Sequence, residues 1–154
     1  MIVIRITIYG MDSKALLRLG NEAFATQRYA EAQDRYRQAI SALATALQCR
    51  RPADTHALIL YSIAIQNLAD THARRERPEL IRDVLLEGCL HLAMWMSGAL
   101  SRGIGGCALG EFGRLRIRLL ALHQSGAGPL DPHQQRALED ATRLLTLEGS
   151  YHDS

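Results

Sequence analysis

Apolar residues recur at three- and four-residue spacings along most of the chain, which is the pattern of an amphipathic helix. The clearest stretch covers residues 14–40, where a polar turn separates two apolar sets. The sets are Leu16, Leu19, Gly20, Ala23 and Phe24, then Tyr29, Ala32, Tyr36, Ala39 and Ile40. Small residues at Gly20, Ala32 and Ala39 would let two antiparallel helices approach closely. The stretch therefore predicts a helical hairpin, whose second helix continues to about Cys49.

The same stretch resembles the tetratricopeptide repeat, a helical hairpin of about 34 residues. The residues at matching places are Leu19-Gly20, Ala23-Phe24, Tyr29, Ala32, Tyr36 and Ala39-Ile40. Leu16 replaces the usual early tryptophan, Gln27 stands where the turn usually carries glycine, and the closing proline is missing. The resemblance is clear over residues 14–40 and weak beyond them. It implies an all-α, right-handed array of antiparallel hairpins whose first helices line a concave, peptide-binding groove.

Four more segments of helical period follow the hairpin. The first begins at Asp54 or Thr55 and ends in the charged residues 71–77. The others are expected over residues 79–100, 107–123 and 132–147. The apolar face of the helix over 79–100 is broad, so this helix should lie at the centre of the core. Six helices make three hairpins, which is about the smallest stable array of such repeats.

The N-terminal residues follow a different period. Isoleucine occupies every second position, as in a strand, at Ile2, Ile4, Ile6 and Ile8. A lone strand cannot satisfy its backbone hydrogen bonds inside a helical protein. Residues 1–11 are therefore expected to be either a dimerising or docking strand or an extension upstream of the true start. The helical domain is predicted over residues 12–148, with Asp12 or Ser13 as its first N-cap, and residues 149–154 as a disordered tail.

Composition fits one soluble domain, because 47% of the 154 residues are hydrophobic and 22% are charged. Cys49, Cys89 and Cys107 are too widely spaced for a paired metal or redox motif. No apolar run approaches the roughly 20 residues that a membrane helix needs. The first ten residues also lack the pattern of a secretory signal. We expect a cytoplasmic protein with free thiols that does not enter the membrane.

No motif indicates catalytic, cofactor or metal chemistry. Residues 103–110 contain a G-x-G-x-x-A pattern, but a predicted helix precedes it and no acidic residue follows at the required distance. We interpret it as a turn and a helix start, where Gly106 and Gly110 allow close packing. The six histidines are dispersed and lack the spacing of metal ligands. We predict a protein that is not an enzyme and holds neither cofactor nor metal.

The arginine clusters of the sequence also have explanations other than nucleic-acid binding. Arg74, Arg75 and Arg77 follow a predicted helix, where cations favour the negative end of its dipole. Arg114 and Arg118 share one face of a later helix, which we interpret as an ordinary solvated face. The formal net charge is only +2, whereas nucleic-acid-binding domains usually carry a marked basic excess. Nucleic-acid binding is therefore disfavoured.

The tetratricopeptide resemblance implies a protein-binding groove on the first helices of two hairpins. The residues that it places there are Lys14, Leu17, Asn21, Phe24, Ile59, Ile63 and Gln66. Capture of an acidic tail would need a cation and an amide where Leu17 and Ile63 stand. We therefore expect a non-catalytic adaptor or chaperone that binds an apolar or amphipathic segment of another protein. The alternative is a self-associating structural subunit, for example a homodimer through Met94, Trp95 and Met96.

Overall fold

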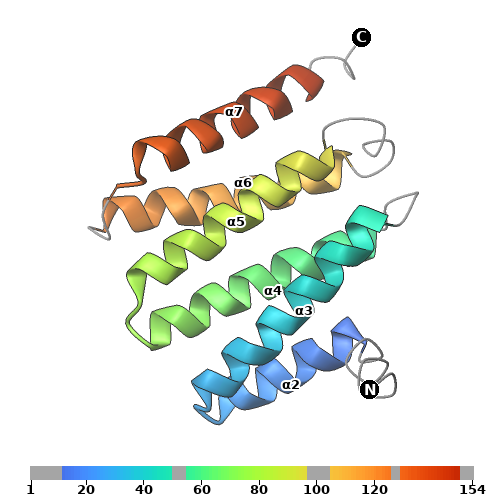
Figure 1. Cartoon of the computed structure of the whole chain (residues 1–154), viewed down its shortest axis with the longest axis vertical. Helices are drawn as coiled ribbons and strands as arrows, with labels where there is room; N and C mark the ends of the chain where they lie inside the picture. Colours follow the sequence, from blue (N-terminus) through green and yellow to red (C-terminus); the bar gives the residue numbers. More distant parts are fainter. Residues whose placement is uncertain (1–11, 50–54, 97–104, 126–128, 150–154) are drawn as a thin grey trace, which may run out of the picture.

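The computed structural model describes residues 12–49, 55–96, 105–125 and 129–149, which form six α-helices (Figure 1). Their bounds are α2 (Ser13–Ala25), α3 (Tyr29–Cys49), α4 (Thr55–Arg74), α5 (Pro78–Met96), α6 (Gly105–Gln124) and α7 (Pro132–Gly149). These residues contain no strand, so the predicted all-α fold is confirmed. The strand-like segment over residues 1–11 lies outside the described residues. Of the tail predicted over 149–154, Gly149 belongs to α7 and residues 150–154 lie outside the described residues. None of the described helices combines the length and apolarity needed to cross a membrane.

The helices stack in chain order from α2 at one end of the molecule to α7 at the other (Figure 1). Helix α3 packs on α2 and α4, and α5 packs on α4 and α6. Helix α4 also contacts α2 and α6, so these three helices form one layer. Helices α3 and α5 contact each other and form a second layer. Helix α7 packs mainly on α5. The pair α6 and α7 is therefore much looser than the hairpins α2–α3 and α4–α5.

The turn between α2 and α3 is a Schellman motif. The Arg28 N–H donates to the carbonyl of Ala23 at 2.8 Å, and the Gln27 N–H donates to that of Phe24 at 3.0 Å. This geometry places Gln27 in the left-handed region, with φ of 60°. Glu76 has the same role in the turn between α4 and α5, with φ of 55°. Both hairpins thus close without the glycine that usually occupies this position.

Helix starts follow local capping chemistry. The Asp12 side chain accepts a hydrogen bond from the Lys14 N–H at 3.2 Å and caps α2. At α7, Asp131 accepts from the backbone N–H groups of His133 and Gln134, each at 2.8 Å. The Gln134 side chain accepts in return from the Asp131 N–H at 3.1 Å, which completes a capping box. The predicted starts of both helices are confirmed.

The close approach of α2 and α3 depends on Gly20. A Cβ atom at this position would lie 2.5 Å from Cε1 of Tyr36, so the tyrosine ring occupies the space that any other residue would need. Ala32 and Ala39 on α3 are completely buried. The predicted seam of small residues is therefore confirmed, and the ring of Tyr36 lies against Gly20 within it.

Gly88 has a similar role at the point where three helices meet. A Cβ atom there would lie 2.6 Å from Cδ1 of Leu115 on α6 and 2.9 Å from Cγ2 of Ile65 on α4. Helix α5 is thus central to the core, as its broad apolar face predicted. Trp95 on this helix is only 2% exposed, so it packs in the core and is absent from the surface that the self-association alternative assigned to it.

The glycines of α6 do not behave like Gly20 and Gly88. Cβ atoms placed at Gly106, Gly110 and Gly113 would meet no side chain or distant backbone among the described residues within 4 Å. The expectation that Gly106 and Gly110 allow close packing within this chain is therefore wrong. The physical reason is their position on the helix, because α5 packs on the opposite side of α6.

Replacing Gly20 with alanine should lower the free energy of unfolding by about 1 to 3 kcal/mol, because the new methyl group overpacks the ring of Tyr36. Chemical denaturation followed by circular dichroism measures the change. Gly110→Ala is the matched control, since its methyl group meets open space and should raise the free energy of unfolding by about 0.5 to 1 kcal/mol. A Gly20→Ala protein as stable as its parent would refute the close contact.

Replacing Gln27 with glycine should raise the free energy of unfolding by roughly 0.5 to 1 kcal/mol, because glycine adopts the left-handed backbone without a steric penalty. The control is Gln27→Ala, which retains the Cβ atom and should stay within about 0.5 kcal/mol of the parent. Urea denaturation compares the two variants. Equal stabilities for glycine and alanine at this position would contradict the observed turn.

Candidate functional site

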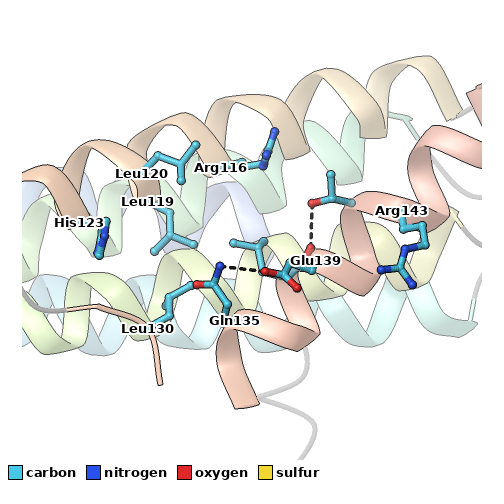
Figure 2. Close-up of a pocket in the computed structure, with 10 residues that line it drawn as sticks. Arg116, Leu119, Leu120, His123, Leu130, Gln135, Glu139 and Arg143 are labelled. Carbon is cyan, nitrogen blue, oxygen red and sulfur yellow. Dashed lines mark hydrogen bonds between the residues drawn. The ribbon is translucent and has the colours of Figure 1, made fainter. Parts of the chain in front are cut away.

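Hollows lie near both ends of the helix stack on the described surface, and they differ in size. The smaller, between α2 and α4, has a volume of about 190 Å³. The larger, between α6 and α7, has a volume of about 370 Å³ (Figure 2). The smaller hollow is lined by Asn21, Phe24, Tyr36, Asn67 and Asp70. Because it contains two of the residues implied by the sequence, it is the first candidate for a binding site.

Two asparagine side chains join α2 and α4 in the smaller hollow. Oδ1 of Asn21 accepts a hydrogen bond from the hydroxyl of Tyr36 at 2.7 Å and another from Nδ2 of Asn67 at 3.1 Å. These two bonds use the acceptor capacity of that oxygen. Nδ2 of Asn21 and Oδ1 of Asn67 have no hydrogen-bond partner among the described residues. The hollow therefore presents an unpaired amide NH2 group and an unpaired amide oxygen.

Tyr36 serves this site as a hydrogen-bond donor. Burial, and to a smaller extent the negative charge of Asp70, raises the pKa of Tyr36 to about 12. The hydroxyl group therefore keeps its proton at neutral pH and can donate to Asn21. Asp70 is itself paired with Arg118 of α6, whose Nη2 lies 2.6 Å from Oδ1 of the carboxylate. The charged group at the edge of the hollow is thus already neutralised.

An aromatic ring and a cation lie at the other side of this hollow. Phe24 is half-buried and meets Tyr29 edge-to-face, with 5.5 Å between the ring centroids. The guanidinium carbon of Arg74 lies 6.0 Å from the centroid of the Phe24 ring, at the limit of a cation–π contact. Phe24 therefore offers a partly covered apolar surface beside the amides.

The structure separates the seven residues that the sequence placed in a groove. Asn21 and Phe24 line the hollow, and Ile59 and Ile63 are exposed on α4. Leu17 is only 6% exposed, so it belongs to the core and presents little surface.

The other two predicted groove residues lie outside the hollow. Lys14 is exposed in the first turn of α2. Gln66 is half-buried and donates through Nε2 to the hydroxyl of Ser62 at 3.3 Å.

Sequence reasoning missed three residues of the hollow. Asn67 and Asp70 lie four and seven positions after Ile63, so they share its side of α4. Extending the predicted face by two turns would have found them. Tyr36 was assigned to the hairpin seam, where it does lie, and its hydroxyl also reaches Asn21. Nothing in the linear order indicated this second role.

A polar seam joins α4 to α6. The Ser62 hydroxyl donates to Oε2 of Glu111 at 2.6 Å, and both residues are buried. Arg114 donates to the other carboxylate oxygen at 2.8 Å. Arg118 pairs with Asp70. Arg114 is 69% exposed, as expected for a solvated face, and pairs within its own helix. Arg118 departs from that interpretation, because it is only 33% exposed and joins α6 to Asp70 on α4.

The thiols of the chain are free, and the structure shields two of them to different degrees. Burial raises the pKa of Cys89 to about 12. Burial, followed by the charge of Glu111, also raises the pKa of Cys107. Both groups therefore stay protonated at neutral pH, while Cys49 is exposed. In the ranges that the structure describes, no three histidine, cysteine or acidic side chains are grouped so that they could hold a metal ion.

Residues 14–99 match the profile of DUF2753, a family of proteins of unknown function. The match covers more than half of the 154 residues. The chain belongs to this family. Comparisons with curated proteins and with solved structures gave no significant match.

Membership of DUF2753 corrects the family suggested by the sequence, because no tetratricopeptide profile matches the chain. The resemblance over residues 14–40 has a physical cause, since a glycine against an aromatic ring suits any closely packed helical hairpin. The DUF2753 match includes all of the smaller hollow, from Asn21 to Asp70. The groove between α6 and α7 lies beyond it.

Replacing Tyr36 with phenylalanine should lower the free energy of unfolding by about 0.5 to 1.5 kcal/mol, because Asn21 loses one of its two hydrogen bonds. The matched control is Tyr29→Phe, whose hydroxyl makes no hydrogen bond with the described residues. Thermal and urea denaturation should separate the two variants. If both are equally stable, the hydroxyl of Tyr36 does not support the hollow.

Proposed function

We propose that this member of DUF2753 is a non-catalytic interaction module that binds an apolar or amphipathic segment of another protein across the outer face of α2 and α4. The observation that carries the proposal is the Asn21–Asn67 pair, which borders the hollow with an unpaired NH2 group and an unpaired amide oxygen. A peptide group offers one N–H and one C=O. The two amides therefore complement the main chain of a bound segment.

The size of the hollow favours a protein ligand over a metabolite. Pockets for small molecules usually measure about 300 to 1,000 Å³, whereas this hollow has about 190 Å³. It can take a side chain or a short stretch of main chain that extends onto the neighbouring surface. Its neutral amides favour main-chain recognition, because they add no charge that would select one kind of side chain.

Apolar side chains extend the binding face beyond the hollow. Ile59 and Ile63 on α4 are 36% and 40% exposed, and Ile117 on α6 is 68% exposed. Residues two positions apart point to nearly opposite sides of a helix. Ile63 therefore points away from the side that carries Ile65, and Ile117 away from the side that carries Leu115. Since Ile65 and Leu115 both meet Gly88 of α5, the exposed isoleucines face away from α5. Exposed apolar groups gathered on one face are typical of interaction surfaces.

The proposal places the protein in the cytoplasm, where its three free thiols would stay reduced. A second copy of the chain is the alternative partner for the same face. Gly106, Gly110 and Gly113 favour it, because the open side of α6 would let another helix approach closely. The mass of a captured complex distinguishes these partners.

The test combines Ile63→Glu with Asn67→Ala, two changes that leave the core intact. The variant should melt within a few degrees of the parent and should lose its bound partner in affinity recovery from native cells. Gln38→Glu, at an exposed position on α3, is the control and should recover the partner normally. A photo-crosslinking residue at Ile59 should capture the same partner. Full recovery by the double variant would refute the proposed face.

A captured partner of the same mass as the chain would identify self-association instead. The crosslink at Ile59 would then join two copies, and the double variant would run as a monomer in analytical ultracentrifugation. A different protein at that crosslink would support the adaptor function.

A further inference from the structure

The groove between α6 and α7 has a floor and walls of leucine. Leu119 on α6 and Leu138 on α7 are buried, and Leu130 before α7 is half-buried. Leu120 lies at the edge and is 45% exposed. Figure 2 shows Leu119 extending from α6 toward Leu130, with Leu120 next to it on the same helix. The groove exists because α7 packs mainly on α5.

The rim of this groove carries an excess of positive charge. Arg116 of α6 and Arg143 of α7 both line it. Arg116 makes no hydrogen bond or ion pair with the described residues, and Arg143 approaches Asp140 only at 3.9 Å. The carboxylate in the lining, Glu139, accepts a hydrogen bond from Nε2 of Gln135 at 3.0 Å. The guanidinium group of Arg116 is therefore available to an acidic partner, and that of Arg143 is 72% exposed and held only by its long pair with Asp140.

We infer that this groove binds an acidic amphipathic helix of a partner protein, with its apolar side chains on the leucines and its carboxylates beside Arg116 and Arg143. The lining residues of α6, from Arg116 to His123, cover about two helical turns. A partner helix would therefore supply anchors at spacings of three, four and seven residues. Charge complementarity identifies the acidic partner. It also disfavours residues 1–11 of this chain, which contain Arg5 and no acidic residue.

The exposure of Leu120 favours a helix over a small molecule. Sites for small molecules usually bury about 70 to 90% of their ligand, and this groove leaves Leu120 open at its edge. A helix would cover that leucine while its polar side stays in water. The inference does not depend on the proposed function, because the smaller hollow is built from α2, α3 and α4.

The test uses two synthetic helical peptides with identical leucine spacing, one with glutamates and one with lysines at the remaining positions. Fluorescence anisotropy with the full chain should show about tenfold tighter binding of the acidic peptide. Added salt should reduce this preference. The double variant Arg116→Glu and Arg143→Glu should reverse it. Leu120→Asp should weaken both peptides by about tenfold.

Matched controls lie on α7, outside the groove. Arg136→Glu and Leu144→Asp change exposed residues of α7 that do not line it, and both variants should bind like the parent. If the Leu120→Asp protein does not fold, the double variant at the exposed residues Arg116 and Arg143 still tests whether the groove prefers the acidic peptide. Equal binding of the two peptides, or equal loss in control and groove variants, would overturn the inference. Binding of dodecanoate without binding of either peptide would also overturn it.

Discussion

The contact between Gly20 and the ring of Tyr36 is the constraint on which the N-terminal half of the structure depends. Because glycine has no side chain, α2 and α3 come close enough for the ring to lie against the backbone. The same position brings the Tyr36 hydroxyl within 2.7 Å of Asn21. A wider hairpin would therefore lose both core packing and the hydrogen bond that orients the amide in the hollow. Stability and the candidate site are coupled through one side chain.

Gly88 and the polar seam together set the position of α6. Leu115 meets α5 at Gly88, and Glu111 meets Ser62 on α4. A shift of α6 along α4 would take the Ser62 hydroxyl away from the buried carboxylate of Glu111 and leave one of its oxygens without a donor, which costs free energy. The network therefore selects one register. In that register the exposed apolar groups of α4 and α6 share the outer face.

The two ends of the helix stack differ in chemistry because they differ in packing. The α2–α4 end is closed by small residues and neutral amides, and its hollow is shallow and uncharged apart from the Asp70–Arg118 pair. At the α6–α7 end, the helices stay apart and leave leucines between two arginines. The two proposed binding sites therefore differ in the chemistry that each would select in a partner.

The sequence by itself determined the six helices, most of their bounds, the turn at Gln27 and the seam at Gly20, because helical period, caps and small residues act locally. It also suggested a family that the DUF2753 match corrected, because the same local seam serves many hairpins. Only the tertiary structure decided that α7 packs on α5, that Leu17 is buried and that Tyr36, Asn67 and Asp70 line one hollow with Asn21. The physical reason is that periodicity defines the faces of a helix, whereas the distance and crossing of distant helices decide which faces meet.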